Sequence, residues 1–138
     1  MSALYVETSA LLAWLLGEPA GDQVRGRIDE AETVVTSVLT QVESTRALAR
    51  AEHDELITAR DAQAVRGLLH RTLAGWMQME ITAEVRERAA HHFPKEPVRT
   101  LDALHLSTAL LFARALPDIE MLSLDSRIQA NAEALGLG

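Results

Sequence analysis

The chain has 138 residues, of which 48% are hydrophobic and 24% are charged, with a formal net charge of −7. These proportions favour one compact domain spanning residues 1–138 and argue against a disordered chain. The lack of cysteine excludes disulfides, zinc–thiolate sites and cysteine nucleophiles. The longest early apolar run, at residues 10–16, is far shorter than the roughly 20 residues of a membrane helix, so we expect a cytoplasmic protein with no membrane segment.

Apolar or β-branched runs alternate along the chain with longer helical patterns. In chain order, the expected elements are a strand at 4–6, helices at 10–16 and 20–31, a strand at 33–36, helices at 37–52 and 54–73, a strand at 77–81, helices at 82–92 and 101–116, a strand at 119–124 and a helix at 125–135. Strands separated by helices imply a parallel sheet with right-handed crossovers. The sequence therefore predicts a three-layer α/β/α domain around a central parallel sheet of four strands.

Four carboxylates occupy positions where such a domain brings strand ends and helix faces together. Glu7 and Asp125 follow predicted strands, at the edge where open parallel sheets bind ligands. Asp102 lies in the first turn of a helix, and Glu43 lies within another. Each is near an apolar stretch, where a charge is costly unless something compensates it. Oxygen ligands without thiolate or paired histidine select Mg²⁺ or Mn²⁺ over zinc, which suits metal-assisted hydrolysis of a phosphate ester.

The net negative charge by itself disfavours a nucleic-acid binder, because phosphate contacts are normally made by a basic surface. Bound divalent ions would offset part of this charge, and local arginines can still form a positive rim. Arg46 and Arg50 follow Glu43 at i+3 and i+7, so all three share one helix face. These arginines are the candidates for contact with the phosphate groups of a nucleic acid.

Each acid also has a simpler explanation. Asp125 can be only a helix N-cap, Asp102 only a favourable first-turn acid, and Glu43 only a solvated helix residue. His105, at i+3 from Asp102 on an apolar helix, is better explained as a buried, hydrogen-bonded histidine than as a general base. It is the joint order and context of the four acids that favours a metal site.

Four segments carry a more specific signal, at residues 5–11, 36–43, 101–109 and 122–127. They resemble the signature blocks of the PIN-domain ribonucleases, and the short format is similar to the VapC toxins of prokaryotic toxin–antitoxin pairs. The resemblance implies a PIN-like fold and a Mg²⁺- or Mn²⁺-dependent endoribonuclease that hydrolyses RNA. It also implies a homodimer restrained by a cognate VapB-like antitoxin. It assigns Glu7, Glu43, Asp102 and Asp125 as catalytic metal-site residues, with Ser9 as a supporting hydroxyl.

Two features depart from the family pattern. The first acid is typically aspartate, in Asp-Thr-Ser, whereas this chain has Glu7. The added methylene moves the carboxylate by about 1.3–1.5 Å, whereas productive sites tolerate about 0.5 Å. The alternative is therefore a catalytically weakened or inactive PIN-like module that binds RNA or its antitoxin without cutting. Many relatives also have a final edge strand, so a fifth strand is left open.

Other function classes with this architecture fit less well. A receiver domain needs paired acids after its first strand, a phosphoacceptor aspartate after the third and a lysine after the fifth. Here Glu7 stands alone, and the only lysine is Lys95, in a predicted loop. A haloacid-type phosphatase needs an Asp-x-Asp pair where this chain has Glu7-Thr8-Ser9.

Overall fold

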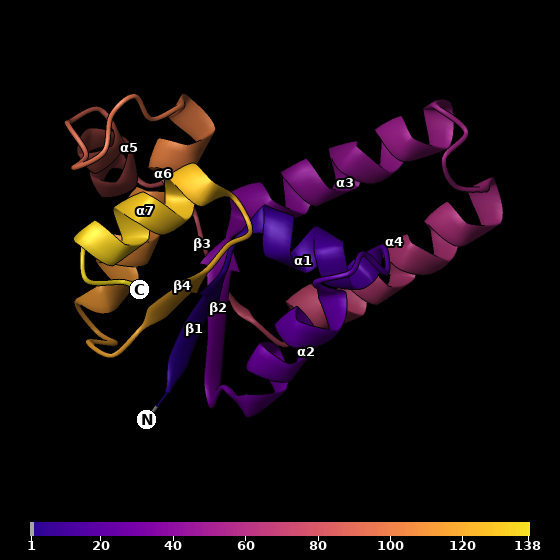
Figure 1. Ribbon diagram of the computed structural model, residues 1–138, viewed down its shortest axis with the longest axis horizontal. Coiled ribbons are helices and arrows are strands. Elements are labelled where there is room, and N and C mark those ends of the chain that lie inside the picture. The colour runs from indigo at the N-terminus through magenta and orange to yellow at the C-terminus, as the bar shows by residue number, and fades with distance from the viewer. Residues whose placement is uncertain (1) are drawn as a thin grey trace.

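The computed structural model describes residues 2–138 and has one four-stranded sheet at its centre (Figure 1). Its strands are β1 (Ala3–Val6), β2 (Thr33–Ser37), β3 (Met77–Met79) and β4 (Glu120–Leu122). They lie in the order β3-β2-β1-β4, and every neighbouring pair is parallel. The predicted parallel sheet of four strands is therefore confirmed, and residues 2–138 contain no fifth strand.

Within residues 2–138, seven helices cover the two faces of the sheet. They are α1 (Thr8–Leu15), α2 (Gly21–Glu30), α3 (Val38–His53), α4 (Ala59–Ala74), α5 (Ala83–Ala89), α6 (Thr100–Ala113) and α7 (Ser126–Ala134). In Figure 1, α1 to α4 lie on one side of the sheet and α5 to α7 on the other. This is the three-layer α/β/α arrangement that the sequence predicts.

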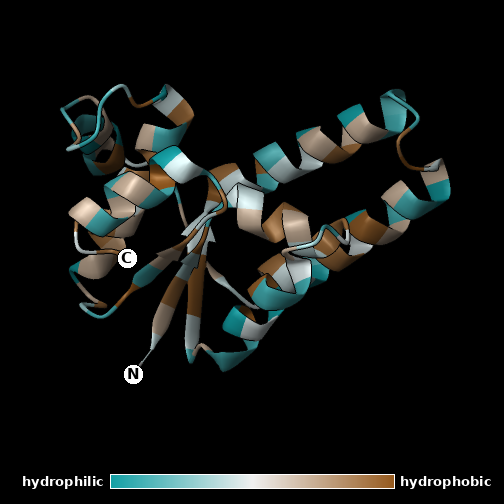
Figure 2. Ribbon diagram, in the orientation of Figure 1, coloured by the Kyte–Doolittle hydropathy of each residue, from teal (hydrophilic) through white to brown (hydrophobic). Residues whose placement is uncertain are grey.

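The side chains of the central strand β1 pack against the helix layers on both faces of the sheet. Successive side chains of a strand point to opposite faces. Tyr5 accordingly packs with α6 residues such as Leu106 and Phe112, whereas Leu4 and Val6 pack with the core beneath α1 to α4. Because both faces are covered, the strand is apolar throughout, and Figure 2 shows the strands as mostly hydrophobic.

Several predicted boundaries were wrong. The helix expected to begin at Asp54 begins at Ala59, because Asp54 caps the end of α3 and Glu55 adopts a positive φ of 59°. Thr58 then caps α4 by accepting a hydrogen bond from the Asp61 backbone. The resulting α3–α4 hairpin extends away from the sheet as an arm (Figure 1), and Leu56 at its turn is 77% exposed.

Other elements are shorter than the sequence predicts. The third strand ends at Met79 rather than at residue 81, and α5 ends at Ala89 rather than at residue 92. The fourth strand covers Glu120–Leu122 rather than 119–124, because pairing with β1 ends at Leu122. The residues that follow Leu122 make side-chain hydrogen bonds at the carboxyl edge of the sheet instead.

Candidate active site

Glu7 directly follows β1 and caps the first turn of α1. Its Oε2 accepts a hydrogen bond from the Ser9 backbone N–H at 3.1 Å. Its Oε1 accepts one from the Ser9 hydroxyl at 2.5 Å and another from the Ser123 hydroxyl at 2.6 Å. Only 5% of Glu7 is exposed, so these three donors compensate a carboxylate that water barely reaches.

Glu43 reaches the same region from the second turn of α3. Its Oε1 accepts hydrogen bonds from the Thr8 hydroxyl at 2.6 Å and from His105 Nε2 at 2.5 Å. Burial raises the pKa of Glu43, but the hydrogen bonds from His105 and Thr8 outweigh this effect and leave that pKa below its ordinary value. Glu43 is therefore ionised at neutral pH.

His105 and Tyr5 lie beneath Glu43. His105 is 1% exposed, and its Nδ1 lies 2.7 Å from the Tyr5 hydroxyl. Tyr5 is fully buried, and this desolvation, with the nearby Glu7 charge, raises its pKa well above the ordinary value of 10.0. The interpretation of His105 as a buried, hydrogen-bonded residue agrees with this geometry.

One potential metal-ligand atom from each of Glu7, Glu43 and His105 lies within 4.8 Å of the other two. We call Glu7 and Glu43 the hydroxyl-held pair, because serine and threonine hydroxyls hold both carboxylates. Within residues 2–138, Glu43 Oε2 accepts no hydrogen bond, and Glu7 Oε2 accepts only the one from Ser9. Each carboxylate thus keeps one oxygen with spare capacity for a cation.

Asp102 and Asp125 are held differently. Arg99 donates from Nε to Asp102 at 3.2 Å and from a terminal nitrogen to Asp125 at 3.5 Å, so we call these acids the arginine-bridged pair. Asp125 also caps α7 through the backbone N–H groups of Arg127 and Ile128. Asp125 is therefore the N-cap of α7, and Asp102 lies in the first turn of α6 as expected.

The loop after β4 connects the two pairs. The Ser123 hydroxyl donates to Glu7 and accepts from the Asp125 backbone N–H at 3.1 Å. Ser9 adds a second connection, because its hydroxyl accepts from the Leu124 backbone N–H at 2.9 Å. The Ser9 side chain therefore holds both Glu7 and the loop that carries Asp125.

Arg46 and Arg50 line a groove along α3 together with Glu43. The groove has a volume of about 470 Å³, and its other lining residues are apolar, among them Val42 of α3 and Leu101 of α6. Both arginines are exposed, and within residues 2–138 neither forms an ion pair. The shared face inferred for Glu43, Arg46 and Arg50 is present, and its two cations are available to an anionic ligand.

These observations can be compared with known proteins. Residues 4–134 match the PIN domain family. The chain belongs to that family. It is 34% identical over 136 residues to ribonuclease VapC35 of Mycobacterium tuberculosis, an alignment that covers 97% of this chain and 93% of the relative. It is 31% identical to ribonuclease VapC46 of the same species, with 99% and 95% covered.

A solved structure supports the same PIN fold. The crystal structure of Mycobacterium tuberculosis VapC20, described as a sarcin-ricin loop cleaving toxin, superposes with a TM-score of 0.66. The two chains are 19% identical, and 92% of this chain and 93% of VapC20 are covered. The resemblance to VapC-type PIN-domain ribonucleases is confirmed. No helix within residues 2–138 has the length and apolar character needed to cross a membrane.

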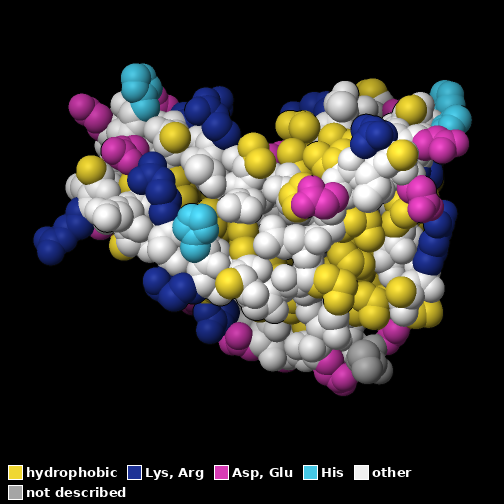
Figure 3. Space-filling model, turned by 180° about the vertical axis from the view of Figure 1, so that it is seen from behind, with side chains coloured by type: hydrophobic (Ala, Val, Ile, Leu, Met, Phe, Trp, Pro, Cys, Tyr) yellow, Lys and Arg dark blue, Asp and Glu magenta, His cyan; other side chains and the backbone are white. Residues whose placement is uncertain are grey.

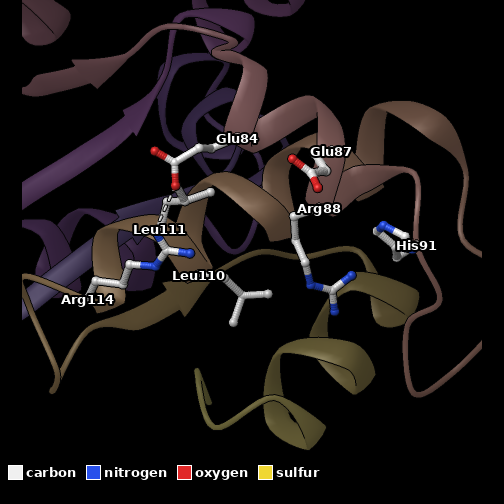
Figure 4. Close-up of a pocket in the computed structure, with 7 residues that line it drawn as sticks. All are labelled: Glu84, Glu87, Arg88, His91, Leu110, Leu111 and Arg114. Atoms are coloured by element: carbon white, nitrogen blue, oxygen red, sulfur yellow. Dashed lines mark hydrogen bonds and ion pairs between the residues drawn. The ribbon is translucent and has the colours of Figure 1, made fainter.

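A second hollow of 400 Å³ lies between α5 and α6 (Figure 4). In this view the Glu84 and Arg114 side chains approach each other, and their ion pair is 2.7 Å long. Arg88, which also lines the hollow, lies over the Phe93 ring at 4.3 Å from its centroid. None of the residues expected in the PIN active site lines it, so we assign the chemistry to the carboxyl edge of the sheet.

Sequence reasoning missed some of the hydrogen-bond donors. The Thr8 side chain, which the sequence does not single out, donates a hydrogen bond to Glu43, 35 positions away. Ser123 was assigned to a strand, but it holds Glu7 across 116 positions. A serine between an apolar run and a candidate acid is the only local signal of this role, and the pairing itself requires the fold.

Proposed function

We propose that this chain is a Mg²⁺- or Mn²⁺-dependent endoribonuclease of the VapC type, which hydrolyses RNA phosphodiester bonds. The observation that carries the proposal is the hydroxyl-held pair at the carboxyl edge of the sheet, connected through Ser123 to the arginine-bridged pair. Open parallel sheets bind ligands at this edge. The ribonuclease names of the VapC35 and VapC46 relatives support the same conclusion.

The donor set fits a hard divalent cation. Carboxylate oxygens suit Mg²⁺ and Mn²⁺, and the chain has no cysteine that would favour zinc. Glu7, Glu43, Asp102 and Asp125 are the residues that would hold the ion or ions. When bound, such an ion activates water and stabilises the leaving oxygen of a phosphodiester.

The arginines give the substrate a place beside these acids. Arg46 and Arg50 carry the unpaired positive charge of the groove that Glu43 also lines. Phosphate groups of a single-stranded RNA would bind there, because guanidinium groups pair well with phosphate oxygens. The arginines thereby offset, at this groove, the overall charge of −7.

The alternative of an inactive binding module rests on Glu7. Its carboxylate is held by three donors, from Ser9 and Ser123. A side chain that only displaced the metal site would not require this set of short hydrogen bonds. This observation supports an active enzyme whose site is adapted to glutamate.

A cleavage assay tests the proposal. The wild-type protein should cut members of a panel of structured RNAs in Mn²⁺ but not in a chelator, and Asp102→Asn should abolish cutting. Glu84→Gln is the matched control, because Glu84 is an acid whose partner, Arg114, lies away from the site. If wild type, Asp102→Asn and Glu84→Gln are equally inactive on every RNA, the binding-module alternative replaces this proposal.

We also propose that a VapB-like antitoxin restrains the enzyme. An arginine of the partner would pair with the site carboxylates, because a guanidinium forms bidentate hydrogen bonds with an acid. Co-purification from the native operon should recover such a partner, and neutralising Glu43 and Asp102 together should weaken its binding. Undiminished binding by that double variant would place the interface elsewhere.

A homodimer is the oligomeric state that we propose. Hydrophobic side chains gather into a broad patch on the face shown in Figure 3, and large exposed apolar patches mark interaction surfaces. Exposed large hydrophobic residues include Val42 and Met77, each 58% exposed. Light scattering coupled to gel filtration should give twice the chain mass of 15.1 kDa, and a monomer at all concentrations would contradict the proposal.

A further inference from the structure

A chain of hydrogen bonds, buried at Tyr5 and His105, leads from the sheet to the partly buried Glu43. It begins at the Tyr5 hydroxyl on β1, passes through both ring nitrogens of His105 on α6, and ends at Glu43 Oε1 on α3. Tyr5 is fully buried and His105 is 1% exposed, so water cannot replace either partner. Their rings also meet edge to face, with centroids 6.0 Å apart.

The Glu43 end of this chain determines which ring nitrogen donates to it. An ionised Glu43 carboxylate can only accept, so His105 Nε2 must carry the proton that lies between them. In the tautomer with its single proton on Nε2, Nδ1 is an acceptor for the Tyr5 hydroxyl, which lies 2.7 Å away. Glu43 Oε1 also accepts a hydrogen bond from the Thr8 hydroxyl.

We infer that His105 is a positioning residue for Glu43, and that Tyr5 holds it in the tautomer which makes this possible. The two donors fix Oε1, so Oε2, which accepts no hydrogen bond within residues 2–138, keeps one orientation toward an ion. Partners of this kind behind a ligating carboxylate strengthen metal binding. The inference rests on the proposed function, because it assigns Glu43 a part in holding the metal.

The alternative role for His105 is direct ligation, since one of its ring nitrogens lies within 4.8 Å of ligand atoms of Glu7 and Glu43. Ligation uses the lone pair of a deprotonated nitrogen. Nε2 has no such lone pair while it donates to Glu43 at 2.5 Å, and Nδ1 faces the buried Tyr5. The hydrogen bonds therefore favour positioning over ligation.

The tautomer can be measured directly in the metal-free protein. Nitrogen NMR of ¹⁵N-histidine-labelled wild type should show His105 protonated at Nε2, with Nδ1 as an acceptor. Tyr5→Phe, which removes the hydroxyl but keeps the ring, should shift the Nδ1 signal. A proton on Nδ1 alone, with Nε2 bare, would overturn the inference whether or not the protein cuts RNA.

Manganese affinity, followed by the electron paramagnetic resonance of free Mn²⁺, gives the second measurement. His105→Leu should weaken binding about 10- to 100-fold, and Tyr5→Phe should weaken it less. His105→Gln should restore much of the affinity, because its amide can still donate to Glu43. A direct ligand would instead lose affinity alike in His105→Gln and His105→Leu, and would be insensitive to Tyr5→Phe.

Ser107→Ala is the matched control. Ser107 is a fully buried polar residue on the same helix, and its hydroxyl has no hydrogen-bond partner, so this change should leave Mn²⁺ affinity unaltered. Equal affinities of wild type, His105→Leu and Ser107→Ala would contradict this inference but not the proposed function. Wild type that binds no Mn²⁺ would contradict the proposed function, and with it the role of Glu43.

Discussion

The two acidic pairs at the carboxyl edge are stabilised by different kinds of donor. Glu7 and Glu43 accept hydrogen bonds from hydroxyl, amide and imidazole groups, whereas Asp102 and Asp125 share the guanidinium of Arg99. Uncharged donors stabilise a carboxylate without cancelling its charge. An arginine cancels part of that charge and must move before a cation can bind both acids. The hydroxyl-held pair is therefore prepared for a metal, and the arginine-bridged pair is partly blocked.

Removing the charge of the hydroxyl-held pair should have the largest effect. A native-state ligand at roughly 100 times its dissociation constant adds about 2.7 kcal/mol to the free energy of unfolding. Wild type should gain on this scale from Mn²⁺, and the Glu7→Gln/Glu43→Gln double variant should gain almost nothing. Thermal melts with and without Mn²⁺ measure both, and Glu84→Gln should keep the full shift. A full shift in the double variant would place the ion elsewhere.

The buried support beneath the hydroxyl-held pair should respond to alkaline pH. Burial raises the pKa of Tyr5 above 10.0, so the unfolded chain releases this proton at a lower pH than the folded protein does. The stability linked to Tyr5 is then fully present below pH 10 and is lost as pH rises toward the folded pKa. The slope is about 1.4 kcal/mol per pH unit. Urea unfolding of wild type and Tyr5→Phe between pH 9 and 11 should differ in this slope.

A spectroscopic control is available because Tyr5 is the only tyrosine in the chain. Phenolate absorbance reports its ionisation without interference from another tyrosine. The folded protein should show no phenolate at pH 10, and unfolding should release it. Ionisation of half the tyrosine near pH 10 in the folded state would show that Tyr5 is not buried as described.

The sequence predicts the sheet of this protein better than it predicts the helix boundaries. Alternating apolar runs were enough for the parallel sheet, because strands such as β1 are buried on both faces and therefore apolar throughout. Helix boundaries were less predictable: nothing in the periodicity of residues 54–58 indicates the positive φ of Glu55 that separates α3 from α4. Local capping preferences, not hydrophobic period, decide where such a turn occurs.

The site acids were predictable in type and order, but their individual partners were not. Glu7 and Asp125 follow strands, so the fold alone places them at one edge. The donors to Glu43 come from α1 and α6, which are 35 and 62 positions away. Pairings of this kind depend on side-chain orientation in the folded protein. His105 could be interpreted as buried, but its choice of Glu43 and Tyr5 as partners could not be foreseen.

A smaller change tests how closely the hydroxyl-held pair is fitted to glutamate. Glu7→Asp withdraws the carboxylate by about 1.3–1.5 Å, which breaks the 2.6 Å hydrogen bond from Ser123. We expect several-fold weaker Mn²⁺ binding and slower RNA cleavage, and Ser123→Ala should have a similar effect. Isothermal titration with Mn²⁺ and a cleavage time course measure these. Faster cleavage by Glu7→Asp would mean that Glu7 attenuates an enzyme built for aspartate.

The smallest effect on stability is expected where the arginine-bridged pair is released. Arg99 is 68% exposed at its side chain, and its bonds to Asp102 and Asp125 are long, at 3.2 and 3.5 Å. Ion pairs of this kind contribute about 0.2–1 kcal/mol, so Arg99→Gln should lower the free energy of unfolding by no more than that. Mn²⁺ affinity should nevertheless rise a few-fold, because the guanidinium no longer competes with the ion for the two aspartates.

Arg114→Gln, which breaks the exposed pair with Glu84, removes the same charge away from the site and should leave Mn²⁺ affinity unchanged. Titrations of Mn²⁺ into wild type and both variants, at low and at high salt, separate competition at the site from a general effect of charge. Equal gains in affinity for Arg99→Gln and Arg114→Gln would show that Arg99 does not block the pair, and that long-range charge alone accounts for the change.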